Sequence, residues 1–256
     1  MMKLEMKRLE TIIAMAELEL RRISHDPIEL FTRAVQPIFW IAIFGSVMAR
    51  VRAFPSTGDY ITFISPGVIL QSSTFISLSY GIMLVFERES GVLKRLLSSP
   101  IPRSFIVIGR SLAGGLRAST QYIIVLLAAV AVGAKITSDP LKLILGYIVL
   151  IIASMGFTAL SILIASGLKT RERFMGIIGA ITMPLFFASN ALYPINVMPK
   201  AIQLLAEVNP LTYTVNALRS LLVDGSYSIG WDMLNIVIFD VVSILVALKL
   251  LHRIIE

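Results

Sequence analysis

The chain has 256 residues, of which 56% are hydrophobic and 15% are charged, and its formal net charge is +7. Soluble domains carry about 25% charged residues, so this composition predicts an all-α membrane protein, whose positive charge suits basic loops rather than a nucleic-acid partner. Cysteine is absent, which excludes disulfides, thiolate metal sites and cysteine nucleophiles.

Residues 1–31 are predicted to form N-terminal helices that precede the membrane domain. Apolar residues recur there at steps of three and four, and they are Met6, Leu9, Ile13, Ala16, Leu20 and Ile23. This spacing predicts an amphipathic helix that lies in the membrane interface or, as the alternative, packs on a protein. Asp26 is expected to cap a connecting helix that begins at Pro27.

Residues 32–256 are predicted to form one membrane domain with six transmembrane helices, because six segments approach the roughly 20 apolar residues that a span requires. The segments are about Thr32–Ala49, Ile61–Phe86, Ala118–Ala134, Leu141–Leu168, Phe174–Leu192 and Met233–Leu251. Pro37 and Pro184 are expected to kink or start their helices, which membrane helices tolerate.

Basic residues predict the orientation, since they gather in cytoplasmic loops. Most of them fall in the N-terminal flank, the loops after the second and fourth expected spans, and the C-terminal tail. Fewer fall in the remaining loops, where they are Arg50, Arg52, Lys135, Lys142, Lys200 and Arg219. We therefore expect a multi-pass protein of the cell membrane with both termini in the cytoplasm.

The segment 193–232 is interrupted by prolines and is not a span. Two apolar runs within it, Ala201–Val208 and Leu211–Val223, are each too short to cross a bilayer. They are predicted to be two short helices that re-enter the membrane from outside, with a turn at Asn209 and Pro210. A small external cap above the membrane is the alternative.

The sequence lacks the motifs of enzyme chemistry. No G-x-x-x-x-G-K-[ST] phosphate loop occurs. The two histidines, His25 and His252, lie near opposite ends of the chain and have no neighbours with zinc-ligand spacing. We therefore expect no catalytic residue, no metal site and no bound cofactor, and a chain that is not an enzyme.

Asp240 is the one carboxylate deep within an expected span. Ionisable groups at such depth are costly and are taken as candidate functional sites, so one hypothesis gives Asp240 a role in proton coupling. The other is a protonated or hydrogen-bonded packing residue. Proton-driven carriers usually have several such groups, which argues against a proton relay here.

The longest charged interruption between apolar runs lies at residues 87–103. Two acidic residues precede two basic ones, an order that suits a helix dipole, and Gly91 is expected to end or kink the helix. We predict a short cytosolic helix that docks on a soluble partner. A solvated loop, the alternative, would expose Val92 and Leu93 without gain.

Two motifs in this order carry a family resemblance. The first runs from Asp59 through Ser65-Pro66-Gly67 to E-R-E-S-G-V-L-K-R-L-L-S-S-P-I-P-R-S and Gly109-Arg110. The second is P-L-F-F-A-S-N-A-L-Y-P-I-N-V-M-P-K, followed by N-P-L-T-Y-T-V-N-A-L-R. Together they resemble the membrane subunits of ABC-2 type transporters, most closely the daunorubicin-resistance branch of drug and lipid exporters, from about Arg21 to Leu251.

The resemblance implies a permease that moves an amphiphilic drug, lipid or glycan outward while a separate ABC ATPase subunit binds ATP and magnesium. It implies two permease copies, as a homodimer among membrane lipids, and two ATPase copies. The implied coupling positions on the cytosolic helix are Glu87, Glu89, Gly91, Lys94, Arg95 and Pro100. The implied pathway residues in the second and fifth spans are Gln71, Thr74, Phe75, Phe186 and Asn190.

Two other hypotheses differ in class. A proton-coupled secondary transporter would use Asp240. A membrane enzyme or assembly factor would bind lipid-linked substrates with its external helices, and it ranks last because no nucleophile or metal set is visible.

Overall fold

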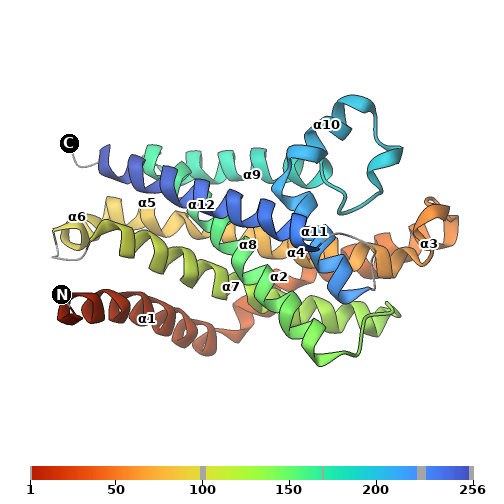
Figure 1. Cartoon of the computed structure of the whole chain (residues 1–256), viewed down its shortest axis with the longest axis horizontal. Coiled ribbons are helices and arrows are strands. Elements are labelled where there is room, and N and C mark those ends of the chain that lie inside the picture. Colours follow the sequence, from red (N-terminus) through yellow and green to blue (C-terminus); the bar gives the residue numbers. More distant parts are fainter. Residues whose placement is uncertain (1, 99–101, 169, 224–228, 254–256) are drawn as a thin grey trace.

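Helices are the only regular elements within residues 2–98, 102–168, 170–223 and 229–253, which are the residues that the computed structural model describes. Most of the long helices run roughly along the long axis of the molecule (Figure 1). Within these residues, five helical stretches are long and apolar enough to cross a membrane: Ile28–Val51, Tyr60–Glu89, Ser104–Val132, Pro140–Gly167 and Ile229–Leu250. The prediction of an all-α membrane protein is confirmed.

The fifth expected span, Phe174–Leu192, is shorter than predicted. It forms α9 (Arg171–Phe187), which has 17 residues and contains Pro184 near its end. The chain then turns, and Tyr60 donates a hydrogen bond to the Leu192 carbonyl at 2.8 Å. Because the segment after Phe187 is held in a turn, the helix lacks its last expected residues, and six spans stay a prediction.

The first span is not a uniform α-helix. It consists of α2 (Pro27–Phe39), a π-helical turn η1 (Trp40–Gly45) and α3 (Ser46–Val51). Asp26 caps α2 as predicted, accepting a hydrogen bond from the Glu29 backbone N–H at 3.0 Å. The irregularity follows Pro37, which cannot donate to the carbonyl four residues earlier.

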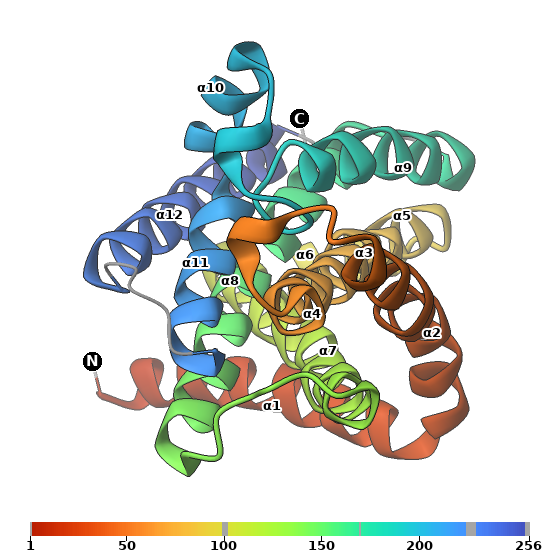
Figure 2. The same ribbon diagram turned by 90° about the vertical axis from the view of Figure 1, so that its right-hand side faces the viewer.

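The second span lies at the centre of the bundle (Figure 2). It consists of α4 (Tyr60–Tyr80) and α5 (Ile82–Glu89), joined at Gly81. Its neighbours α7 (Arg103–Val132) and α8 (Pro140–Gly167) cover one side of it. The Gly81 N–H donates to Ser161 Oγ of α8 at 2.9 Å, so the backbones of the two spans approach closely there.

The N-terminal helix α1 (Met2–His25) packs on α7. The expected apolar face does not make this contact, because Ile13 and Leu20 are 59% and 52% exposed. Glu19, which is 1% exposed, lies on the packed face and pairs with Arg117 of α7. The sequence therefore predicted the helix but not its packed face, and a position of the helix in the membrane interface stays a prediction.

The segment 193–223 forms two short helices, as expected, after the 3₁₀ turn η3 (Ile195–Val197). They are α10 (Lys200–Val208) and α11 (Pro210–Leu222), and Asn209 between them accepts from the Leu211 N–H at 2.9 Å. Figure 1 shows α10 projecting from the bundle, whereas α11 is buried against α8 and α12 (Ile229–Arg253). Re-entry into a bilayer stays a prediction.

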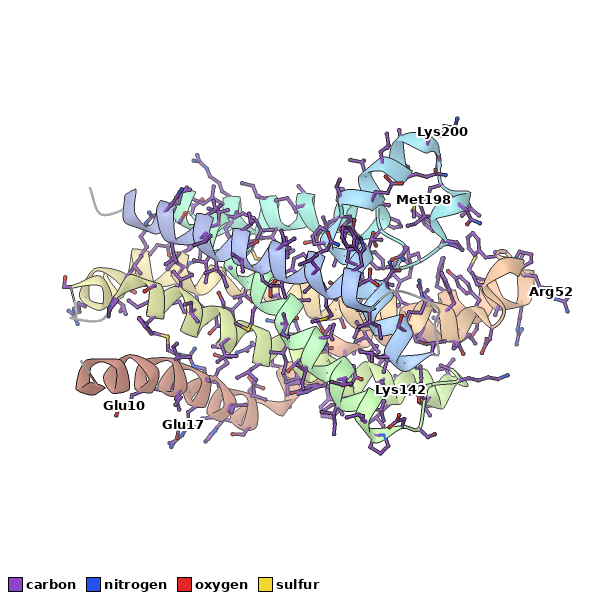
Figure 3. All side chains as sticks on the ribbon, viewed as in Figure 1. Glu10, Glu17, Arg52, Lys142, Met198 and Lys200 are labelled. Atoms are coloured by element: carbon purple, nitrogen blue, oxygen red, sulfur yellow. The ribbon has the colours of Figure 1, made fainter. Side chains whose placement is uncertain are left out.

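The two ends of the bundle differ. Figure 1 shows both termini and α6 (Val92–Leu97) at one end, and α3 and α10 at the other. Arg52, Lys142 and Lys200, which the sequence assigns to external loops, lie toward the second end (Figure 3). Glu10 and Glu17 extend from α1 away from the bundle. The arrangement separates the residues of the expected cytoplasmic loops from those of the external ones.

Candidate transport groove and coupling end

The expected coupling segment is divided between two helices. α5 ends at Glu89, and α6 begins at Val92 after a turn in which Gly91 has a φ of 74°. Glycine adopts this left-handed conformation without a Cβ penalty, so the predicted break at Gly91 is confirmed. Glu87 and Glu89 consequently lie at the end of the second span and not at the start of the short helix. The expected order, with acidic residues before basic ones in a single helix, is therefore not found.

The two acidic residues of this segment are paired within the chain. Glu87 Oε2 accepts a hydrogen bond from Arg110 of α7. Glu89 pairs with Arg171 of α9 at 2.6 Å, and the Arg171 guanidinium lies 3.6 Å from the centre of the Phe86 ring. These contacts join the end of α5 to two other helices, α7 and α9, and so position α6, which follows α5.

The outward face of α6 is formed by Val92 and Arg95, which are exposed, while Leu93 is buried and anchors the helix. Lys94 belongs to α6, and Pro100 lies outside the described residues. Arg88 donates to the carbonyls of Leu168 and Ser166 at 2.9 and 3.1 Å, which fixes the end of α8 at the same level. The docking of α6 on a partner stays a prediction.

A groove of about 240 Å³ opens on the other side of the second span, between α2, α4 and α9. Its lining combines hydroxyl and carboxamide groups with one aromatic ring and one thioether. The lining residues are Thr32, Arg33, Gln36, Pro37, Gln71, Ser72, Phe75, Ile76, Gly179, Thr182 and Met183.

Two of the five candidate pathway residues lie in this groove. Gln71 is 9% exposed, and Phe75 is 40% exposed. Phe75 is the one exposed side chain of α4. The structure therefore brings Gln71 and Phe75 together at a surface that a ligand can reach.

The other three candidates lie elsewhere. Thr74 is buried within the bundle, and its hydroxyl has no hydrogen-bond partner among the described residues. Phe186 is buried in edge contact with Trp40, at 6.2 Å between ring centres. Asn190 donates to Asn216 Oδ1 at 2.5 Å near the α10 end. None of these residues lines the groove.

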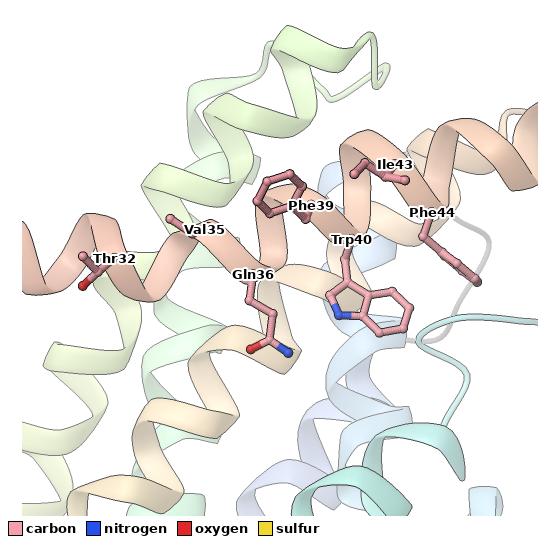
Figure 4. Close-up of a pocket in the computed structure, with 7 residues that line it drawn as sticks. All are labelled: Thr32, Val35, Gln36, Phe39, Trp40, Ile43 and Phe44. Carbon is pink, nitrogen blue, oxygen red and sulfur yellow. The ribbon is translucent and has the colours of Figure 1, made fainter.

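The α2 side of the groove was missed by the sequence reasoning. Thr32, Gln36 and Trp40 recur every four residues, a spacing that places them on one helix face, and this was the available signal. Figure 4 shows that face, where a hollow of about 590 Å³ is lined by Thr32, Val35, Gln36, Phe39, Trp40, Ile43 and Phe44. Thr32 and Gln36 line both spaces, so the groove continues into an aromatic hollow.

Comparison with known proteins gives this architecture a family. Residues 10–223 match the ABC-2 type transporter family. The chain belongs to that family. The match begins within α1, earlier than the resemblance from Arg21 that the motifs suggested, and it ends before α12.

Three relatives illustrate the similarity to other ABC-2 type proteins. The transport permease ycf38 of Cyanophora paradoxa is 30% identical, over 91% of this chain and 86% of that protein. The daunorubicin resistance ABC transporter permease protein DrrB1 of Streptomyces coeruleorubidus is 26% identical, over 78% of this chain and 70% of its own. A permease protein of Mycobacterium tuberculosis H37Rv named for doxorubicin resistance, DrrC, is 25% identical, over 80% and 74%. The chain is thus the membrane subunit of an ABC transporter.

An ion-pair network ties α1 to the rest of this ABC-2 protein. Arg117 of α7 binds both Glu19 of α1 and Glu29 of α2. Glu29 also pairs with Arg33 at 2.8 Å. The network holds three helices together next to the groove, and sequence reasoning missed it because its members are far apart in the chain.

Asp240 belongs to α12, which lies on the opposite side of the bundle from α2 (Figure 2). It is buried against α8, where a Cβ on Gly156 would come 1.9 Å from Asp240 Oδ1. Oδ1 has no hydrogen-bond partner among the described residues. Among all the described residues, no group of three or more His, Asp or Glu side chains is placed to hold a metal ion.

Arg219 corrects the assignment of basic residues to loops. It was counted in an external loop, but it is buried in α11. Its Nη2 donates to the carbonyls of Phe63 and Asn190 at 3.2 and 3.1 Å, and its guanidinium lies 3.8 Å from the centre of the Phe63 ring. Arg219 therefore joins α11 to α4 and to the turn after α9 in this ABC-2 protein, and it says nothing about loop orientation.

Proposed function

We propose that this chain is the permease subunit of an ATP-binding cassette exporter that moves an amphiphilic substrate outward. The observation that carries the proposal is the groove, which combines polar and aromatic linings in a member of a transporter family. The energy comes from ATP bound with magnesium and hydrolysed in a separate ATPase subunit. A drug, a lipid or a glycan fits the groove's chemistry, and the resistance names of two relatives favour a drug.

The proposed topology has six spans, with α9 as the fifth. Its 17 residues extend about 26 Å at 1.5 Å per residue, which is slightly short of a hydrocarbon core and is accommodated by local thinning. An odd number of spans would put the two termini on opposite sides, whereas both lie at one end of the bundle (Figure 1). The bias of basic residues assigns that end to the cytoplasm.

The proposed assembly contains two copies of this permease and two ATPase subunits. α6 docks on the ATPase through Val92 and Arg95, and Glu87 and Glu89 act indirectly, by fixing α6 through their partners on α7 and α9. A homodimer suits the exposed apolar faces of α2 and α9, which flank the groove and include Phe31, Val35, Met175 and Ile177.

Co-purification with candidate ABC ATPase subunits from the same organism tests the proposal. We expect a stable complex in which Val92→Asp or Arg95→Ala lowers ATP hydrolysis about tenfold, because removal of a contact at the centre of an interface costs on the order of 1–2 kcal/mol. Lys200→Ala, at the other end of the bundle, is the matched control. A complex whose ATP hydrolysis is the same with all three variants would contradict docking through α6.

A proton-coupled transporter is the second candidate function, because the buried Asp240 Oδ1 lacks a partner among the described residues. On this hypothesis Asp240→Asn abolishes uptake driven by a pH gradient in proteoliposomes that contain no ATP. Transport that requires ATP and survives the substitution supports the exporter instead.

A further inference from the structure

We propose that the groove binds the uncharged polar head group of a neutral amphiphile, with Gln71 and Gln36 as its hydrogen-bonding residues. This inference rests on the proposed function and names the substrate class. Gln71 is 91% buried, and its carboxamide faces the groove without a hydrogen-bond partner among the described residues. The residue lines the groove with its hydrogen-bonding groups unused by protein, so a ligand in the groove can bond to it.

Gln36 provides a second carboxamide, which is exposed where that of Gln71 is recessed. It lines the groove and the aromatic hollow, points from α2 toward them (Figure 4), and has no partner in the described part of the chain. Each carboxamide offers two N–H donors and one carbonyl acceptor. This combination matches hydroxyl and amide groups, which donate and accept hydrogen bonds, and ester groups, which accept them. Such groups occur in sugar, glycerol and peptide head groups.

The charges around the groove disfavour an ionic head group. Among the described residues no acidic side chain lines it, so a cationic group would meet an aromatic ring but no counter-charge. Its one cation, Arg33, is already bound by Glu29, which accepts from Nε at 3.0 Å and pairs with Nη2 at 2.8 Å. An anion would have to compete with that carboxylate, so neither charge sign is complemented.

The depth of the groove points the same way. Gln36 lies eight residues after Ile28, where the first span begins, which corresponds to about 12 Å along the helix. A charged head group at that depth is costly, whereas a neutral one bonded to carboxamides is not. The tail of the ligand would follow the hollow past Trp40 and Phe44, which continues from Gln36.

Photolabelling of the permease–ATPase complex in phosphatidylcholine nanodiscs tests the inference. The probes are three amphiphiles with the same benzophenone-bearing alkyl chain and a glucoside, phosphate or trimethylammonium head group. We expect the glucoside to label α2, α4 and α9 most strongly. Gln71→Leu and Gln36→Leu should each lower this labelling about fivefold, as loss of one neutral hydrogen bond does, and Gln71→Lys should shift the preference to the phosphate.

Ser77→Ala is the matched control, because Ser77 lies on the buried side of α4 and donates to the Ser73 carbonyl. Equal labelling by the three probes, or labelling that neither glutamine variant reduces, overturns the inference. So does a Phe75→Cys variant that forms a disulfide with a second copy in this otherwise cysteine-free chain, since a partner helix would then fill the groove.

ATP hydrolysis of the same samples separates the two proposals. A complex that couples to ATP but shows no head-group preference overturns the neutral-ligand inference and leaves the exporter proposal standing. Selective glucoside labelling without any effect of the probe on ATP hydrolysis supports the neutral ligand and contradicts the exporter proposal.

Discussion

Polar groups on the two sides of the second span differ in their hydrogen bonding. On the packed side, toward α7 and α8, Ser73 donates to the Ala118 carbonyl at 3.1 Å and the Gly81 N–H donates to Ser161 Oγ at 2.9 Å. On the groove side, the Gln71 carboxamide has no partner among the described residues. Ser73 and Gly81 thus hold helices together through hydrogen bonds, whereas the Gln71 carboxamide is available to a ligand.

The contrast extends to the helices around α4. α7 packs closely against both α1 and α8 and shares the buried Glu19–Arg117 ion pair with α1, whereas α2 and α9 lie at the periphery of the bundle (Figure 2). A polar residue on the packed side contributes mainly to stability, and one on the groove side mainly to ligand binding. This distinction is measurable by substitution.

The largest effect is expected for Arg117→Met on the packed side. The substitution leaves Glu19, whose side chain is 2% exposed, without its main counter-charge. Breaking such a buried pair costs about 3 kcal/mol, which corresponds to a fall in Tm of roughly 6–12 °C for a chain of this size. Thermal unfolding of the purified permease in detergent measures it.

Arg21→Met is the control for that prediction, because the Arg21–Glu17 pair on the outer face of α1 is exposed. It should change stability by less than about 1 kcal/mol. If Arg117→Met lowered the Tm no more than Arg21→Met, the packed side would not depend on the network.

The fold was predictable where local patterns determine it. The cap at Asp26, the turn at Gly91 and the pair of helices around Asn209 each follow from one or two residues of the sequence. The early end of α9 was not, because the turn after it is held by residues far away in the chain: Asn209 donates to the Leu185 and Ala188 carbonyls, and Tyr60 donates to the Leu192 carbonyl. Long-range contacts of this kind leave no local pattern.

The next effect tests how closely the packed helices approach. A Cβ on Gly81 would come 2.6 Å from the Ser161 carbonyl oxygen, a backbone atom that cannot rotate away. Gly81→Ala is therefore expected to cost about 1–3 kcal/mol, even though alanine favours a helix. Gly176→Ala on α9 meets nothing within 4 Å, so the same substitution should be neutral or slightly stabilising there. Equal Tm values for the two variants would contradict the close approach.

The candidate site was predictable only in part. Of the candidate pathway residues that the resemblance implied, Gln71 and Phe75 lie in the groove, but Thr74 beside them is buried on the other side. Consecutive residues of a helix point in different directions, and a resemblance alone does not give the helix rotation. The Gln36 contribution needed the spatial pairing of α2 with α4, which the four-residue spacing on α2 does not supply.

The smallest effect on stability is expected for Phe75→Ala, and a second truncation on α4, Leu78→Ala, is its comparison. Leu78 is fully buried on the packed side, so Leu78→Ala leaves a cavity and should cost about 2 kcal/mol or more. Truncation of Phe75 removes more atoms, but its side chain is 40% exposed in the groove. Phe75→Ala should therefore cost less than about 1 kcal/mol of stability. Thermal unfolding ranks the two variants, and the glucoside probe should label Phe75→Ala less than the parent protein. If Phe75→Ala were less stable than Leu78→Ala, the loss of stability would follow side-chain size and not exposure. The Phe75 ring would then be a packing residue.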